Sequence, residues 1–258
     1  AGNLGEKENI PTYIVGGYVR DTLLGKSCQD IDIMVEGDGI AFAKKLAREL
    51  KVNVTVDYDK FGTAMIPYPD VEIEVATARI EKYRSDSRKP EVTSSTIEED
   101  MSRRDFTINA IAASLLPSSL GELYDPFGGI KDLQKGLIIT PLDPDETFSD
   151  DPLRMLRAVR FAAQLEYDVA STILESISRN INRLEIVSWE RIRDEIIKSL
   201  TTNKPSIAFY LMKETGLLTH VFPEMDIMSG VETINGRGHK DVFIHTLQVV
   251  DNAAKLSD

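Results

Sequence analysis

The sequence predicts an α+β protein, in which a small mixed sheet with flanking helices precedes a region that is helical almost throughout. Between residues 12 and 75, short runs rich in Val and Ile surround a segment of helical apolar spacing. From residue 152 onward, the apolar spacing is helical almost without interruption. Strands that precede a block of helices, rather than alternating with helices throughout, are typical of α+β proteins.

Four short runs are predicted to be strands because each is rich in Val and Ile. They are Thr12–Val15, Ile31–Val35, Val52–Val56 and Val71–Val75. Between the second and third runs, Ala and Leu recur at helical spacing, which predicts an amphipathic helix over Gly39–Leu50. A small mixed sheet flanked by helices follows from this order.

The middle of the chain is less regular. Residues 79–104 are polar, densely charged and without clear periodicity, and they predict a long loop. The apolar segment Ile108–Leu115 predicts a short buried helix. Turn-forming residues gather at Asp125–Gly129 and Pro141–Asp145. We place a domain boundary near residue 140, where strands give way to helices.

The helical region begins at a clear start signal. Pro152 suits the first position of a helix, and Asp151 suits its N-cap. Further helices are predicted at Ala170–Arg179, Trp189–Leu200, Pro205–Thr215 and Val242–Leu256. The chain is therefore divided into a head at 1–140, a helical neck at 141–204 and the start of a helical body at 205–258.

Composition narrows the class of protein. The chain is 42% hydrophobic and 28% charged, as in a soluble globular protein, and its apolar runs are shorter than the ~20 residues that span a bilayer. The N-terminal segment lacks the layout of a signal peptide. A single Cys28 excludes an internal disulfide framework, and three His offer no zinc-ligand spacing, which predicts a cytoplasmic protein. The net charge of −12 argues against nonspecific nucleic-acid binding but leaves a local basic surface open.

The strongest chemical pattern is GGYVRD at 16–21, followed by a strand that carries Asp30 and Asp32. Successive strand residues face opposite sides, so both carboxylates share one face while Ile31 and Ile33 pack behind. The two Cα atoms lie roughly 7 Å apart at a rise of about 3.3 Å per residue. Such carboxylates suit Mg²⁺, and two ions about 3.5–4 Å apart stabilise both oxygens of a phosphoryl displacement.

The glycines before this strand fit the same chemistry. Gly16 and Gly17 allow a triphosphate to approach the backbone closely, and Arg20 can pair with its charge. Taken alone, a D-x-D pair or a Gly-Gly pair is common at ordinary strand ends and turns. Their combination with Arg20, in the correct strand context, favours a functional interpretation.

Several motifs then follow in a consistent order between residues 12 and 200. They are IVGGYVRDTLLG and DIDIMV at 14–35, FGTA at 61–64, VEIEVATARIEKY at 71–83, RRDFTINAIA at 103–112, YDPFGGIKDL at 124–133, DDPLRMLRAVRFAAQL at 150–165, and WERIRDEIIKSL at 189–200. Together they resemble the class II tRNA nucleotidyltransferases (CCA-adding enzymes) and the bacterial poly(A) polymerases. The resemblance implies a polymerase-β-like nucleotidyltransferase head that adds CMP and AMP to the 3′ end of tRNA from CTP and ATP, without a template.

The resemblance also implies roles for single residues in the head. Asp30 and Asp32 would hold two Mg²⁺ ions, with Glu74 as a third catalytic carboxylate on the neighbouring strand. A solvated strand face is the alternative for Glu74. Gly17 and Arg20 would hold the triphosphate.

The RRDFTINA motif supplies three further candidates. The resemblance implies that Arg104 contacts a nucleotide phosphate, Asp105 supports the ribose, and Asn109 orients the sugar or base. A salt bridge at a helix start is the alternative for Arg104 and Asp105. We favour the functional roles because the whole motif is present.

The most informative set comprises Asp151, Arg154, Arg157 and Arg160, each three residues after the last. Adjacent members are neighbours on a helix, but the set winds around it. Asp151 can accept from the exocyclic amine of cytosine or adenine while Arg154 donates to the ring, whereas guanine and uracil present oxygen there. The resemblance implies that this pair selects CTP and ATP; an N-cap and a solvated arginine stripe are the alternatives. Asp150 stands where the family commonly has Glu, so we leave it out of the site.

Other functions stay open at the level of sequence. Poly(A) polymerases, and enzymes that add only CC or only A, share nearly every motif. The resemblance links the 79–104 segment to the switch from C to A, and its full length favours complete CCA addition. A nucleotide- or RNA-binding module without catalysis is the alternative from another class. The tail with His239, Asp241 and His245 resembles the opening of an HD-type domain. Neither the mode of RNA binding nor the oligomeric state can be inferred.

Overall fold

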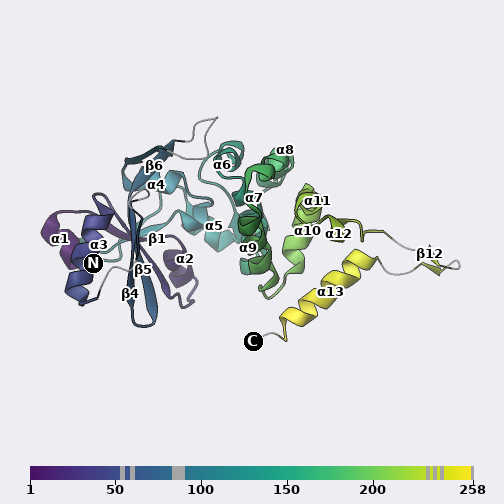
Figure 1. The fold of residues 1–258 in the computed structure, drawn as a ribbon, viewed down its shortest axis with the longest axis horizontal. Helices are drawn as coiled ribbons and strands as arrows, with labels where there is room; N and C mark the ends of the chain where they lie inside the picture. The colour runs from purple at the N-terminus through teal and green to yellow at the C-terminus, as the bar shows by residue number, and fades with distance from the viewer. Residues whose placement is uncertain are drawn as a thin grey trace. The chain divides into compact units, whose positions relative to one another are not determined.

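The computed structural model describes residues 1–52, 56–58, 62–82, 91–230, 233–234, 237–238 and 241–256. The chain forms two compact units, Ala1–Leu133 and Gln134–Asp258 (Figure 1). The first unit is built around a sheet and the second around helices. The head-like and helical parts expected from the sequence are both present, in that order.

The first unit contains a seven-stranded sheet in the order β3-β4-β5-β2-β1-β8-β9. Its strands, together with a separate β6–β7 pair, are β1 Thr12–Val15, β2 Asp30–Val35, β3 Val56–Tyr58, β4 Thr63–Tyr68, β5 Val71–Thr77, β6 Arg79–Lys82, β7 Glu91–Ser94, β8 Ala112–Ser114 and β9 Leu123–Tyr124. Its helices are α1 Gly2–Glu8, α2 Gly17–Leu23, α3 Gly39–Leu50, α4 Ile97–Ser102 and α5 Gly129–Lys135, with 3₁₀ turns at Thr107–Asn109 and Pro117–Ser119. Because β2 and β5 run parallel while the other pairs of this sheet are antiparallel, the sheet is mixed.

One face of the sheet is apolar and covered by helices. Ile33 and Val35 of β2 pack with Ile73 and Val75 of β5 in a core that also takes in Phe42 of α3. This alternation is the one predicted for the DIDIMV strand, whose apolar residues point into the core. The acidic residues of β2 and β5 therefore lie on the opposite face.

The segment expected to be a loop at 79–104 contains regular structure instead. β6 and β7 pair antiparallel, with Arg79 opposite Ser94, and α4 follows. Thr96 caps α4 through the backbone N–H of Glu99, and the Glu99 carboxylate accepts from the Thr96 N–H in return. The sequence thus contains a Thr-x-x-Glu capping box, which predicts a helix start, within a segment whose dense charge favoured a loop.

The buried helix expected over Ile108–Leu115 is wrong. A 3₁₀ turn over Thr107–Asn109 leads into β8, whose Ala112 lies opposite Val15 of β1. Periodicity cannot distinguish helix from strand in a short buried apolar run. Here residues 112–114 form a strand because they pair with the edge of β1. The predicted Val52–Val56 strand lies partly outside the described residues, and β3 begins at Val56.

The second unit is mostly helical. Its helices are α6 Pro144–Asp150, α7 Leu153–Leu165, α8 Ser171–Asn180, α9 Trp189–Leu200, α10 Ser206–Thr215, α11 Leu217–Val221, α12 Pro223–Asp226 and α13 Val242–Ala254, with a 3₁₀ helix at Ile181–Ile186. Its strand pairs are the parallel β10 Leu137–Ile138 with β11 Asp168–Val169, and β12 Thr233–Ile234 with β13 Arg237–Gly238. In the described part of the chain, no helix has both the length and the apolar character needed to cross a bilayer.

Helix α7 is the centre of this unit. Met155, Leu156 and Val159 are fully buried, and α9 and α10 pack against the helix. α7 starts at Leu153 rather than at Pro152, and Asp151 closes α6. The Asp151 carboxylate still accepts the N–H of Leu153 at 3.2 Å, so it serves the start of α7 as expected of a capping residue.

Candidate active site

A row of carboxylates lies on the face of the sheet opposite the core around Phe42. In the parallel pairing of β2 and β5, Asp30 lies opposite Glu72 and Asp32 opposite Glu74. Directly opposed residues on neighbouring strands share a face, so all four side chains project from the same side. The predicted association of Asp32 with Glu74 follows from this register.

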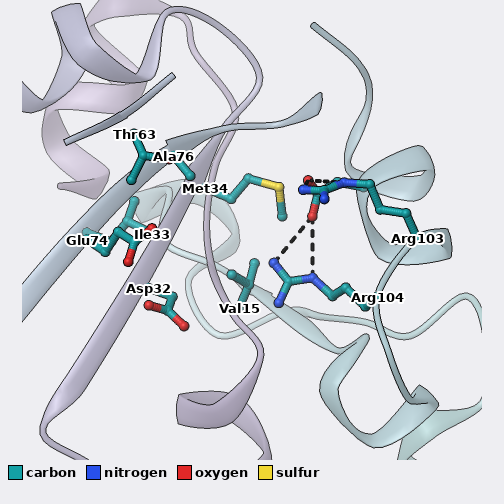
Figure 2. Close-up of a pocket in the computed structure, with 10 residues that line it drawn as sticks. Val15, Asp32, Ile33, Met34, Thr63, Glu74, Ala76, Arg103 and Arg104 are labelled. Atoms are coloured by element: carbon teal, nitrogen blue, oxygen red, sulfur yellow. Dashed lines mark hydrogen bonds and ion pairs between the residues drawn. The ribbon is translucent and has the colours of Figure 1, made fainter. Parts of the chain in front are cut away.

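Asp32 and Glu74 line a pocket of about 200 Å³ (Figure 2). Figure 2 shows both carboxylates projecting from neighbouring strands, with Arg104 reaching toward them from the other side. Arg103 also lines the pocket, whereas Asp30 is exposed and lies outside its lining. Carboxylates therefore line one side of the pocket and guanidinium groups line the other.

Asp32 is the most perturbed of these carboxylates. Burial raises the pKa of the Asp32 carboxyl above its ordinary value, the Arg104 guanidinium acts to lower it, and Asp30 acts to raise it. A desolvated carboxylate beside a like charge gains from a bound cation.

The donor chemistry fits a divalent metal. Carboxylate oxygens are the ligands that Mg²⁺ prefers, and Mg²⁺ usually takes one or two protein carboxylates and completes its shell with water and substrate phosphate. Among the described residues, no three His, Cys, Asp or Glu side chains are grouped closely enough to hold a metal alone. An ion held by Asp30 and Asp32 would complete its shell with water and with oxygens of a substrate.

The turn after β1 brings the glycines to the same place. Gly16 has φ of 69° and ψ of −130°, a conformation that essentially only glycine adopts. A Cβ added at Gly16 would lie 2.8 Å from Nη1 of Arg104 and 3.8 Å from Oδ2 of Asp32. The backbone at Gly16 therefore lies against both walls of the site, as close approach of a ligand requires.

Arg20, Asn109 and Asp105 form a buried chain of hydrogen bonds. Nη1 of Arg20 donates to Oδ1 of Asn109 at 2.7 Å, and Nδ2 of Asn109 donates to Oδ1 of Asp105 at 3.0 Å. Arg20 is also bound to Asp21 and is almost fully buried. This placement favours a role in holding Asn109 over the direct phosphate contact that the resemblance implied.

Sequence reasoning missed the acid that holds the two arginines of the pocket. Asp100, on α4, is 2% exposed. Its Oδ1 accepts from Arg103 at 2.6 Å, and its Oδ2 accepts from Arg104 at 3.3 Å (dashed in Figure 2). The spacing of three and four residues between Asp100 and these arginines was the available signal.

In the second unit, Asp151 is held from two sides. Besides the Leu153 N–H, its carboxylate accepts from Nη2 of Arg191 on α9 at 2.8 Å. Arg154 lies near the same helix start, where its Nη1 lies 3.5 Å from the carbonyl oxygen of Thr147. The structure thus keeps Asp151 and Arg154 together at the start of α7, and it adds Arg191, which sequence reasoning missed.

The last two arginines of the set face α9. Nε of Arg160 donates to Oε2 of Glu195 at 2.6 Å, and Nη1 of Arg157 lies 3.9 Å from Oε1 of Glu195. Arg160 is 7% exposed and also donates to Gln164 at 2.6 Å. Its burial favours a structural role for Arg160 over contact with a nucleotide. Arg157 is partly exposed and stays a candidate.

Two family matches cover most of the chain. Residues 12–139 match the family described as Poly A polymerase head domain, and residues 166–228 match the one described as Probable RNA and SrmB-binding site of polymerase A. An A-adding tRNA nucleotidyltransferase of Geobacter sulfurreducens is 35% identical over 259 residues, which cover 99% of this chain and 27% of that protein. The Multifunctional CCA protein of Nitrosomonas europaea is 36% identical and is matched over 94% of this chain and 57% of its own length.

A solved structure agrees with these sequence matches. The Thermotoga maritima CCA-adding enzyme, complexed with tRNA, has a TM-score of 0.75 and 35% identity over 91% of this chain and 52% of its own. The chain therefore spans only 27% to 57% of the length of these three proteins. Both compact units fall within the matches, and the carboxylate row lies within the head-domain match. The chain belongs to the family of class II tRNA nucleotidyltransferases and bacterial poly(A) polymerases.

Proposed function

We propose that this chain carries the catalytic core of a nucleotidyltransferase that adds CMP and AMP to the 3′ end of tRNA from CTP and ATP, with release of pyrophosphate. The observation that supports the proposal most directly is the pocket in which Asp32 and Glu74 project from neighbouring strands and face Arg104. Carboxylates opposed to a guanidinium suit a substrate whose phosphates carry negative charge and bind cations.

Different residues of the head have different roles in the proposed phosphoryl transfer. Asp30 and Asp32 would hold Mg²⁺, two ions in our proposal, and Glu74 would add a carboxylate from the neighbouring strand. When bound there, a divalent cation would supply activation of the attacking 3′-hydroxyl and neutralisation of charge on the triphosphate. Arg104 contacts a phosphate, and the turn at Gly16 lets the triphosphate approach the backbone.

Two further groups of residues orient the nucleotide. Asn109 and Asp105, held by buried Arg20, support the sugar. Asp151 accepts from the exocyclic amine of cytosine or adenine, while Arg154 donates to the ring. Because guanine and uracil offer no donor at that position, this pair selects CTP and ATP without a template.

Addition of AMP alone is the second candidate. It is favoured by the Geobacter sulfurreducens protein, which is named an A-adding enzyme and is matched over 99% of this chain. Three tRNA primers separate the two functions: one that lacks CCA, one that ends in C and one that ends in CC. Complete addition extends all three to CCA with CTP and ATP together. An A-adding enzyme extends only the primer that ends in CC, and only with ATP, while long A tails identify a poly(A) polymerase.

Substitution of Asp32 tests whether the carboxylate row is catalytic. We expect Asp32→Asn to lower turnover by about 100-fold or more, as removal of a group that supports transition-state charge does. Asp70→Asn, in the exposed β4–β5 turn with φ of 65°, is the matched control and should leave turnover unchanged. Full incorporation by Asp32→Asn would refute the catalytic assignment of the carboxylate row, whereas wild-type protein that binds nucleotide without incorporating it would favour a binding module without catalysis.

A further inference from the structure

Helix α9 meets the start of α7 through one ion pair. Nη2 of Arg191 donates to Oδ2 of Asp151 at 2.8 Å, while Oδ1 of Asp151 accepts the N–H of Leu153 at 3.2 Å. The two bonds are made to different oxygens of one carboxylate. Together they fix both the rotation of the carboxylate and the direction in which its remaining lone pairs point.

The same face of α9 also contacts two arginines of the set. Glu195 follows Arg191 by four residues, so the two side chains are neighbours on the helix surface. Glu195 binds Arg160 at 2.6 Å and lies 3.9 Å from Arg157. Helix α9 therefore contacts three members of the set through two of its own residues, and Arg191 is the one that reaches Asp151.

A carboxylate that selects a base depends on its direction. It has roughly four lone-pair positions, and Arg191 and Leu153 occupy two of them. The others stay available to a further donor, in directions set by the two bonds already made. Without Arg191, the carboxylate keeps, among the described residues, the bond from the Leu153 N–H and can turn about its χ2 bond, which has a broad torsional preference.

The Arg191–Asp151 ion pair is exposed enough that its loss should affect the orientation of Asp151 without unfolding the protein. The Arg191 side chain is 53% exposed and the Asp151 side chain 24%, and ion pairs this accessible to water contribute little to stability. Glu195, by contrast, is 4% exposed and belongs to the packed interior. Removal of Arg191 should therefore leave the helices folded while it frees Asp151.

We propose that Arg191 is a positioning residue that sets base selection, because it holds the Asp151 carboxylate in the orientation that accepts an exocyclic amine. The inference rests on the proposed function, in which Asp151 contacts the base. It adds a determinant on α9, which is separated from Asp151 by forty positions in the sequence.

The test compares two arginines of the same helix. Arg193 is 59% exposed and forms one ion pair at 2.8 Å, as Arg191 does, but its partner is the adjacent Asp194. Incorporation into tRNA is measured for CTP, ATP, UTP and GTP, and kcat/KM for CTP or ATP is divided by that for UTP or GTP. We expect Arg191→Met to lower this ratio by about tenfold, which corresponds to about 1.4 kcal/mol, and Arg193→Met to leave it unchanged.

A double-mutant cycle with Asp151→Asn confirms the route of the effect. If Arg191 acts through Asp151, the selectivity of Asp151→Asn should not fall further when Arg191→Met is added. A wild-type ratio in active Arg191→Met, equal losses in Arg191→Met and Arg193→Met, or additive losses in the double variant would each overturn the inference.

Two other outcomes also test the inference. If circular dichroism shows that Arg191→Met is unfolded, the ratio is measured on Arg191→Lys, whose point charge cannot reproduce the guanidinium geometry. A reduced ratio supports the inference, and a wild-type ratio overturns it. Wild-type protein that incorporates neither CMP nor AMP would overturn the proposed function and this inference together.

Discussion

The buried ion pair between Arg160 and Glu195 offers the sharpest test of how the helical unit is held together. The side chains are 9% and 4% exposed, and Nε of Arg160 lies 2.6 Å from Oε2 of Glu195. Removing one partner of a buried pair typically costs about 3–5 kcal/mol, because the other charge stays buried. Glu195→Leu therefore removes the carboxylate that binds the buried Arg160 guanidinium.

Other contacts of Arg160 place the expected cost at the lower end of this range. Gln164 still accepts from Nη1 at 2.6 Å, and the Phe161 ring lies 4.0 Å from the guanidinium carbon. We expect Glu195→Leu to lower the free energy of unfolding by about 3 kcal/mol. With a urea slope of about 2 kcal/mol/M, the midpoint of the transition falls by roughly 1.5 M.

Urea unfolding followed by the helical circular dichroism signal measures this shift. Glu175→Leu removes one partner of an exposed pair on α8, whose side chains are 69% and 55% exposed, and should cost less than about 0.5 kcal/mol. The double variant Arg160→Met/Glu195→Leu should recover most of the loss, because it removes the buried guanidinium together with the carboxylate that binds it. The reasoning fails if Glu195→Leu unfolds like Glu175→Leu, or if the double variant is no more stable than the single one.

Two further predictions concern the glycine turn and the acid stability of the helical unit. Gly16→Ala should lower the free energy of unfolding by about 1–3 kcal/mol, because φ at this position is positive. It should also raise KM for the nucleotide, because the added Cβ would lie 2.8 Å from Nη1 of Arg104. Gly25→Ala is the control: φ is 70° and nothing lies within 4 Å of the added Cβ, so only stability should fall. A KM equal in the two variants would contradict this. The hydrogen bond from Lys213 lowers the pKa of Asp226, so its stabilisation is present above about pH 4 and is lost as pH falls through the lower folded-state pKa. Asp226→Asn should therefore flatten the acid fall of the urea midpoint, and an unchanged slope would count against the pair.

Local patterns in the sequence predicted the faces of the elements correctly. Alternation in DIDIMV placed Asp30 and Asp32 on one side and Ile33 in the core, because side chains of a strand alternate whatever the strand pairs with. Helical spacing likewise predicted α9 with its observed bounds, Trp189–Leu200. These features depend only on neighbours a few positions away along the chain.

Elements whose form depends on a partner were predicted less well. The apolar stretch Ile108–Leu115 could have been helix or strand, and only the edge of β1 made part of it β8. β4, Thr63–Tyr68, was not predicted at all, because its alternation is weak and it contains Pro67. Its place between β3 and β5 comes from pairing on both sides.

The sequence by itself determined which residues could carry the chemistry and toward which face of a strand or helix they point. Only the tertiary structure decided which of them meet: Asp32 lies beside Glu74 through the β2–β5 register, Arg20 is buried against Asn109, and Arg191 reaches Asp151. The physical reason is the distance along the sequence over which each kind of interaction acts. Backbone geometry relates residues within a few positions, whereas these contacts join positions 40 to 89 residues apart and depend on how whole elements pack.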